Sequence, residues 1–206
     1  MTDQIDKIIY INLDKRQDRY KEINEELQRM NLAHLAERFS GIEVAPPMGI
    51  LGCGKSHLAV LKLAKERGYK RVLILEDDLQ FKVDCSHLES CLTKLFQEHP
   101  QFDVCFLTCY LNEGTVIENA PFLTKVRSAT TASAYIVQDH YLDELINLYE
   151  WAMPQLEETQ QHWIYANDQV WNNLQKRDQW ICFTERLGVQ RPGFSDNSQI
   201  YIEREV

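Results

Sequence analysis

Three consecutive carboxylates, Glu76, Asp77 and Asp78, directly follow the apolar run 72–75. A run of this kind, rich in aliphatic and β-branched residues, is typical of a buried strand in a parallel sheet. The carboxylates should therefore lie at the carboxyl-terminal edge of that strand, where open α/β sheets bind their ligands. Three adjacent negative charges repel one another, and a hard divalent cation with oxygen ligands would stabilise them. The pattern thus indicates a metal-assisted site.

Two other interpretations of the acidic triplet stay open. A solvated acidic turn after a core strand would have the same sequence, and the phospho-acceptor receiver domains of signalling proteins also carry acidic strand ends. A receiver begins near this strand and needs a second acidic strand end later in the chain. Here a long β-α-β-α segment precedes the triplet, and no aspartate occurs between Asp103 and Asp139. The sequence therefore disfavours a magnesium-binding receiver.

The segments around the triplet alternate between strand and helix patterns. Apolar residues at 20, 23, 27 and 30 follow the first apolar run at helical spacing, and Gly68 and Pro100 are expected to end two later helices. The polar stretch after Gly188 is expected to be irregular. The expected strands are 7–13, 39–44, 71–75, 103–109, 114–117, 122–126 and 133–137, and the later helices are 58–67, 88–96, 142–149 and 167–174. This order predicts an α/β fold, and the length of 206 residues favours one domain.

Composition excludes several classes of protein. A net charge of −9 argues against nucleic acid as a partner. The six cysteines contain no Cys-x-x-Cys and mostly lie in apolar segments, so we expect buried thiols rather than disulfides or a zinc site. No window approaches the ~20 apolar residues of a transmembrane helix. The first residues lack the basic start and apolar core of a signal peptide, so a cytoplasmic location is expected.

Three motifs in order, 9–19 (IYINLDKRQDR), 52–57 (GCGKSH) and 74–78 (ILEDD), resemble those of glycosyltransferase family 25. That family includes lipopolysaccharide β-galactosyltransferases and procollagen hydroxylysine galactosyltransferases. Segments 131–137 (TASAYIV) and 191–196 (RPGFSD) are similar to its later blocks. The resemblance therefore covers almost the whole chain.

The resemblance implies a GT-A architecture, which is a mixed, mostly parallel sheet flanked by helices with a Rossmann-like nucleotide-binding half. Donor binding would occupy about 1–110 and acceptor binding about 111–206. The implied reaction transfers galactose or glucose from a UDP-sugar, with inversion and with Mn²⁺ or Mg²⁺, to a hydroxyl of a glycan, a lipid-linked glycan or hydroxylysine. The alternative is a catalytically inactive module of the same fold that only binds a nucleotide sugar.

The resemblance also implies roles for individual residues. A cation that bridges diphosphate oxygens would stabilise the leaving group. By analogy with GT-A enzymes, Asp78 is the expected direct ligand of that cation, with Glu76 as a further candidate. Glu76 and Asp77 could instead contact sugar, ribose or bound water. The full set of expected donor-binding residues is Asn12, Leu13, Arg16, Arg19, Lys55, Ser56, His57, Glu76 and Asp77.

Several of these residues have a purely structural alternative. The planar guanidinium groups of Arg16 and Arg19 match phosphate, but either could pair with a surface acid. The 52–57 segment could offer backbone N–H groups and the charge of Lys55 to an anion at a helix start. Ser56 could equally be only a helix cap and His57 only a core histidine.

Inversion requires a base on the face of the sugar opposite the leaving group. Asp168 is the expected base, because it opens a predicted helix after a segment rich in aromatic residues. The alternative is an aspartate placed there for the helix dipole. Asp196 is the second candidate, either as base or as a further residue around the metal. Among four tryptophans, Trp163 is expected nearest the acceptor, since aromatic faces pack against sugar rings.

Overall fold

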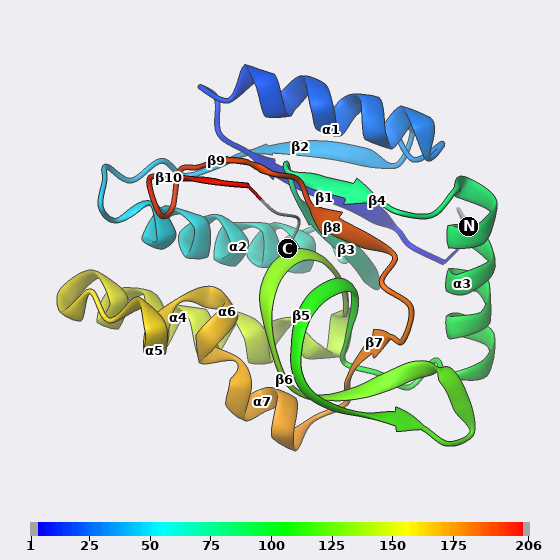
Figure 1. Cartoon of the computed structure of the whole chain (residues 1–206). Helices are drawn as coiled ribbons and strands as arrows, with labels where there is room; N and C mark the ends of the chain where they lie inside the picture. Colours follow the sequence, from blue (N-terminus) through cyan, green and yellow to red (C-terminus); the bar gives the residue numbers. More distant parts are fainter. Residues whose placement is uncertain (1–3, 204–206) are drawn as a thin grey trace.

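The computed structural model describes residues 4–203 and is built around a six-stranded sheet with the order β2-β1-β3-β6-β5-β7 (Figure 1). Within that sheet β6 is antiparallel to its neighbours, and the other strands share one direction. The mixed, mostly parallel sheet predicted from the sequence is therefore confirmed. Its strands are β1 (Lys7–Asn12), β2 (Ala36–Ser40), β3 (Arg71–Glu76), β5 (Val104–Ile117), β6 (Ala120–Gln138) and β7 (Trp180–Phe183).

Helices cover both faces of the sheet and give three layers (Figure 1). α1 (Gln17–Arg29) and α3 (Cys85–Glu98) pack on one face. The other face carries a larger group, which is α2 (Gly49–Glu66), α4 (Leu142–Thr159), α5 (His162–Tyr165), α6 (Asn167–Val170) and α7 (Asn172–Arg177). Among the described residues, every helix is too short or too polar to cross a bilayer.

The strand before the acidic triplet is buried on both faces, as predicted. Val72 and Ile74 face the α2 and α4 layer, whereas Leu73 and Leu75 face the α1 and α3 layer. All four side chains are at most 1% exposed, and burial of each is worth about 1.5–3 kcal/mol. This anchoring fixes the position at which Glu76 leaves the sheet.

An aromatic cluster joins the second half of the chain to the sheet. Phe106, Tyr135, Trp171 and Trp180 pack with ring centroids 5.1–6.3 Å apart. The indole N–H of Trp171 donates to the carbonyl of Ala129 at 3.1 Å, so this buried donor is satisfied. The cluster holds the α6–α7 segment against β5 and β6.

Several predicted boundaries were wrong, and each has a physical reason. Strand 39–44 ends early because β2 pairs with β1 only as far as Ser40, opposite Asn12, the last residue of β1. Strands 114–117 and 122–126 are the outer parts of β5 and β6, whose long hairpin contains several register shifts. These shifts interrupt the regular alternation of side chains along both strands, so each long strand has the sequence pattern of two short ones.

The C-terminal stretch after Gly188, expected to be irregular, forms three short strands. β8 (Gly188–Gln190) pairs with β4 (Leu79–Phe81), which directly follows the acidic triplet. β9 (Gly193–Ser195) and β10 (Ile200–Ile202) pair with each other. The pairing of β8 with β4 brings residues 188–190 beside the carboxyl-terminal edge of β3.

The helix expected at 58–67 begins nine residues earlier, at Gly49, and Gly68 follows its end with a φ of +67°, as predicted. Residues 53–57 therefore lie beyond the first turn, where backbone N–H groups are bonded within the helix. The expected anion cradle at a helix start is wrong. Close packing accounts for Gly52 instead, because a Cβ there would lie 2.4 Å from the carbonyl oxygen of Ile42.

This packing predicts that Gly52→Ala destabilises the protein. Alanine in a helix interior is ordinarily better than glycine by about 0.5–1 kcal/mol. At this position the clash with backbone should reverse the sign and lower the free energy of unfolding by about 1–3 kcal/mol, measured by urea denaturation. Gly54→Ala is the matched control, since its Cβ would meet the thioether of Met153 rather than backbone, and its cost should be smaller. An increase in stability for Gly52→Ala would contradict the packing argument.

Candidate active site

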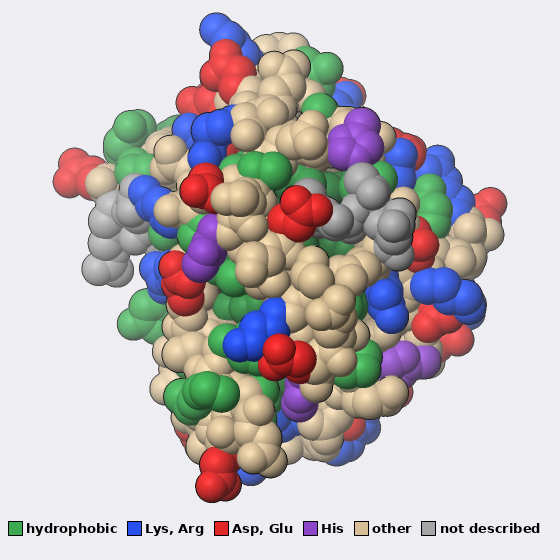
Figure 2. Space-filling view, turned by 90° about the vertical axis from the view of Figure 1, so that its right-hand side faces the viewer, with side chains coloured by type: hydrophobic (Ala, Val, Ile, Leu, Met, Phe, Trp, Pro, Cys, Tyr) green, Lys and Arg blue, Asp and Glu red, His purple; other side chains and the backbone are tan. Residues whose placement is uncertain are grey.

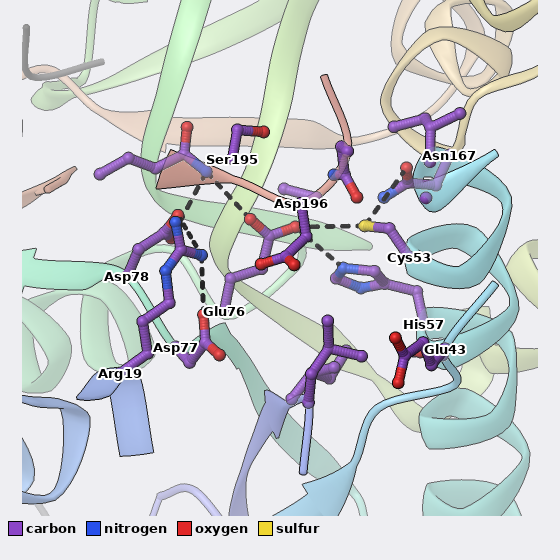
Figure 3. Close-up of a pocket in the computed structure, with 18 of the residues that line it drawn as sticks. Arg19, Glu43, Cys53, His57, Glu76, Asp77, Asp78, Asn167, Ser195 and Asp196 are labelled. Carbon is purple, nitrogen blue, oxygen red and sulfur yellow. Dashed lines mark hydrogen bonds and ion pairs between the residues drawn. The ribbon is translucent and has the colours of Figure 1, made fainter. Parts of the chain in front are cut away.

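A cavity of about 240 Å³ lies at the carboxyl-terminal edge of β1 and β3 and is lined by both halves of the chain. The acidic triplet forms one wall, and α2 contributes Cys53 and His57 (Figure 3). β6 and α6 supply Thr131 and Asp168. The C-terminal segment closes the remaining side with Gln190, Arg191, Gly193, Ser195, Asp196, Asn197, Gln199 and Ile202.

The three carboxylates have different partners. Arg19, from α1, has Nη1 3.0 Å from Asp77 Oδ1 and 3.1 Å from Asp78 Oδ2, so it supplies the counter-charge to both. Asn12 Nδ2 donates to the other oxygen of Asp77 at 2.8 Å. Glu76 turns toward α2 instead, where it meets His57 (Figure 3).

Their ionisation also differs. Burial raises the pKa of Asp78 to about 7, and the charges of Glu76 and Asp77 add to this while Arg19 opposes it. Burial likewise raises the pKa of Asp77, against Arg19 and Asn12. Burial disfavours ionised Glu76 as well, but the hydrogen bond with His57 brings its pKa below the usual value. The site thus contains an ionised Glu76 beside a carboxyl group that titrates near neutrality.

His57 is fully buried and links the triplet to the sheet. Its Nε2 lies 3.2 Å from Glu76 Oε1 and its Nδ1 lies 2.8 Å from the hydroxyl of Tyr135. Because a carboxylate only accepts, Nε2 carries a proton, and in the neutral ring Nδ1 then accepts from the Tyr135 hydroxyl. Gln190 Nε2 donates to the other oxygen of Glu76 at 3.0 Å. His57 is both a satisfied core histidine and a residue that positions Glu76.

Asp168 occupies the opposite wall at the second residue of α6, close to the predicted helix start. Its Oδ2 accepts a hydrogen bond of 3.0 Å from the backbone N–H of Thr131. Thr131 has a φ of +74°, a conformation that β-branched residues rarely adopt and that marks stored strain. Burial raises the pKa of Asp168, and the negative charge of Glu76 acts in the same direction.

Asp196, the other expected base, is held by two cations. Arg16 Nη1 lies 2.5 Å from its Oδ2, and Lys15 Nζ lies 3.1 Å from its Oδ1. Although burial opposes ionisation, these two cations lower the pKa of Asp196. It projects toward the middle of the cavity from the segment after β9 (Figure 3).

The structure brings most of the predicted residues to the cavity but turns three aside. Leu13, Arg19, Ser56, His57, Glu76, Asp77, Asp78, Asp168 and Asp196 line it. Asn12 lies behind Asp77 and also accepts from Arg38, so its amide is occupied. Lys55 pairs with Glu157 at the surface. Arg16 lines a neighbouring cavity together with Arg191.

Ser56 lines the cavity, yet its hydroxyl has local backbone partners. It donates to the carbonyl of Gly52 at 2.7 Å and accepts from the N–H of Ile42 at 2.8 Å. Ser56 therefore ties α2 to the loop after β2. It is not a helix cap, because α2 begins seven residues earlier.

Several lining residues were not predicted as site residues, and the polar ones closest to Glu76 and Asp168 include Cys53, Thr131, Asn167 and Gln190. Cys53 precedes His57 by one helical turn, a spacing that places both on one face of α2. Its Sγ lies 3.7 Å from Glu76 Oε1 and 3.9 Å from Asn167 Oδ1, and burial raises its pKa so that the thiol stays protonated. Gln190 reaches the cavity only through the pairing of β8 with β4, which leaves no local signal.

Comparison with known proteins is informative for the fold. No protein-family model matches the chain, and a search of curated proteins found no relative. Among solved structures, the chain is similar to A197 from STIV at 10% identity, covering 96% of this chain and 93% of that one with a TM-score of 0.50. It is also similar to the glycosyltransferase GlyE of Streptococcus pneumoniae TIGR4 at 12% identity, with a TM-score of 0.51. That match covers 86% of this chain and 44% of GlyE.

At such low identity a structural likeness establishes the fold alone. The protein has a glycosyltransferase-type α/β fold with the mixed, mostly parallel sheet of GT-A proteins, as predicted. Open α/β sheets generally bind ligands at the carboxyl ends of their strands, and the cavity lies at that end of β1 and β3.

The pKa of Asp78 predicts a pH dependence of stability in the metal-free protein. Between its ordinary pKa of 3.8 and about 7, the folded state retains a proton that the unfolded state has released. The free energy of unfolding should therefore fall as the pH rises through this range and then level off. Asp78→Asn should make that decrease smaller, with Asp77 and Asp168 still contributing, and should raise the free energy of unfolding at about pH 8 by about 1–3 kcal/mol.

Urea denaturation in EDTA at about pH 5 and about pH 8 measures this difference. Asp143→Asn is the control, because Asp143 is an exposed carboxylate paired with Lys65 on the surface. Equal pH dependence in wild type and Asp78→Asn would show that Asp78 titrates alike in the folded and unfolded states.

Proposed function

We propose that this protein is a metal-dependent inverting glycosyltransferase that moves galactose or glucose from a UDP-sugar to an acceptor hydroxyl of a glycan or hydroxylysine. One observation carries the proposal. All five segments that resemble family 25 (9–19, 52–57, 74–78, 131–137 and 191–196) contribute side chains to the same cavity, although they are spread over most of the chain. Convergence of this kind is expected of a shared site and not of unrelated similarities.

The donor set of the cavity fits a hard divalent cation. Asp77 and Asp78 are 7% and 9% exposed and share a single guanidinium, so their charge is only partly compensated. Carboxylate oxygens are the ligands that Mn²⁺ and Mg²⁺ prefer. Asp78 would hold the cation, with Glu76 as the second candidate ligand. When bound, the cation would stabilise the negative charge that develops on the diphosphate leaving group.

Cations of the chain would help to bind the donor. Lys15 and Arg19 line the cavity, and their charges suit the diphosphate. Both are engaged with carboxylates of the site, Lys15 with Asp196 and Arg19 with Asp77 and Asp78. Donor binding would therefore exchange part of these ion pairs for contacts with phosphate oxygens.

We assign the base to Asp168 in preference to Asp196. The raised pKa of Asp168 makes its carboxylate a stronger proton acceptor, and the N–H of Thr131 holds one of its oxygens in place. Asp196 is a weaker base because Arg16 and Lys15 lower its pKa. In this assignment the Asp168 carboxylate takes the proton of the acceptor hydroxyl.

The surface beside Asp168 suits a sugar acceptor. Trp163 on α5 is 63% exposed and Trp151 on α4 is 56% exposed, and α5 directly precedes α6. Large exposed aromatic side chains pack well against the apolar faces of sugar rings. These two tryptophans therefore favour an acceptor that contains a sugar ring.

The first test concerns the donor. Wild type should bind UDP in the presence of Mn²⁺. Asp78→Asn should weaken that binding at least about tenfold, because losing a residue that binds the metal directly is more damaging than losing one that only orients the metal ligands. Isothermal titration calorimetry with and without EDTA measures the effect, with Asp143→Asn as a surface control. If wild type shows neither UDP binding nor any dependence of that binding on Mn²⁺, the proposed function fails.

The second test separates an enzyme from an inactive binding module. Asp168→Asn should retain Mn²⁺-dependent UDP binding while transfer or hydrolysis of UDP-galactose and UDP-glucose falls by about 10²–10⁴-fold. Release of UDP is the measurement, and Asp196→Asn is the comparison. Full turnover by Asp168→Asn would reject the base assignment. Binding without turnover in wild type, across an acceptor array, would favour the inactive module.

A further inference from the structure

A second cluster of metal-binding side chains lies outside the proposed active site. Among residues 4–203, two groups of three such side chains have donor atoms within 4.8 Å of one another. One, Cys53 with His57 and Glu76, belongs to the cavity described above. The other is His87, Cys91 and Glu185, and none of these lines that cavity. Figure 2 shows the α3 side of the molecule, where histidine side chains lie among acidic and basic ones at the surface.

The second cluster joins two elements that are far apart in sequence. His87 and Cys91 are four residues apart on α3, so they share one face of the helix. Glu185 lies between β7 and β8, and its Oε2 is 2.8 Å from His87 Nε2. Two of the three donors therefore already meet, and the thiol lies one turn away.

Both elements are held in place before any metal binds. The carboxylate of Asp84 caps α3 by accepting from the N–H of His87 at 2.8 Å. On the other side, the N–H of Thr184 donates to Phe122 at 2.9 Å and that of Leu187 donates to Leu107 at 3.2 Å. The residues flanking Glu185 are thus fixed to the β5–β6 hairpin, which limits the entropy lost on binding.

The chemistry of the three donors selects the metal. We propose that His87, Cys91 and Glu185 form a Zn²⁺ site whose fourth position is open to water. Imidazole, thiolate and carboxylate are the protein ligands of Zn²⁺, whereas Mn²⁺ and Mg²⁺ prefer oxygen alone. The thiolate and the carboxylate together balance the charge of the ion.

The geometry needs only side-chain movement. Tetrahedral zinc places its ligand atoms roughly 3.5 Å apart, given metal–ligand distances of about 2.0–2.3 Å. The donor atoms all lie within 4.8 Å of one another, so none has to close by more than about 1.3 Å, and the His87–Glu185 pair at 2.8 Å has to open slightly. The His87 and Glu185 side chains are 47% and 59% exposed, so both are free to rotate toward the ion.

A bound ion would clamp α3 to the segment that enters β8. β8 pairs with β4 immediately after the acidic triplet and ends with Gln190, which contacts Glu76. Zinc would stabilise this arrangement by binding the folded state and not the unfolded one. The site is independent of the proposed transferase activity, since it requires neither donor nor acceptor.

The test uses the full chain after removal of metal with a chelator, and Co²⁺ as a coloured substitute for Zn²⁺. In Cys53→Ser, where the cavity lacks its thiol, Co²⁺ should give a thiolate charge-transfer band at one equivalent, and Zn²⁺ should displace it. Adding Cys91→Ser should abolish the band, and adding Glu185→Gln should weaken Co²⁺ binding at least about tenfold. Adding Cys85→Ser, a thiol on the same helix outside the cluster, should change nothing.

A second measurement keeps the test independent of Cys53→Ser. In the wild-type background Zn²⁺ should raise the melting temperature, and Cys91→Ser should remove most of that rise while Cys85→Ser keeps it. Absence of the band in correctly folded Cys53→Ser would overturn the proposal, and so would a band or a melting shift that persists in Cys91→Ser. UDP binding should be the same in Cys91→Ser and wild type, so failure of the zinc site and failure of the transferase proposal remain distinguishable.

Discussion

The structure depends on compensating three adjacent carboxylates at the end of a buried strand. β3 fixes their backbone in the core, where their mutual repulsion is least screened by water. Arg19 on α1 binds Asp77 and Asp78, and His57 on α2 binds Glu76. Helices from both layers are therefore drawn to one edge of the sheet, and the cavity forms between them. The compensation is partial, since the pKa of Asp78 rises to about 7, and a partly compensated site is suited to a further cation.

The opposite wall of the cavity depends on hydrophobic packing. The aromatic cluster around Trp171 fixes α6 and α7 against β5 and β6. The cluster thereby brings Asp168 within hydrogen-bonding distance of the N–H of Thr131, whose backbone is in a strained conformation. Packing of large aromatic side chains can hold a backbone in a conformation that local preferences disfavour. The wall with the acidic triplet and the wall with Asp168 thus rest on two different forces, ion pairing and apolar burial.

Local patterns predicted the parts of the fold that depend on local physics. The run before Glu76 was identified as a buried strand because its residues are apolar on both faces. Gly68 was identified as a helix end because the left-handed backbone conformation favours glycine. The start of α2 was missed because Gly49 and Gly52 are poor helix formers, and their presence reflects close approach of other backbone segments. The β5–β6 hairpin was predicted as separate short strands because its register shifts interrupt the regular strand pattern.

The sequence by itself determined which chemical groups are available and which strand presents them, because burial and periodicity are local properties of the chain. It placed Glu76, Asp77 and Asp78 at a sheet edge and Asp168 near a helix start. Only the tertiary structure decided how those groups are paired. It placed Lys55 against a surface acid, brought Gln190 into the cavity and joined Glu185 to α3. Ion pairing, desolvation and metal-ligand geometry depend on distances between segments remote in sequence, which no local pattern specifies.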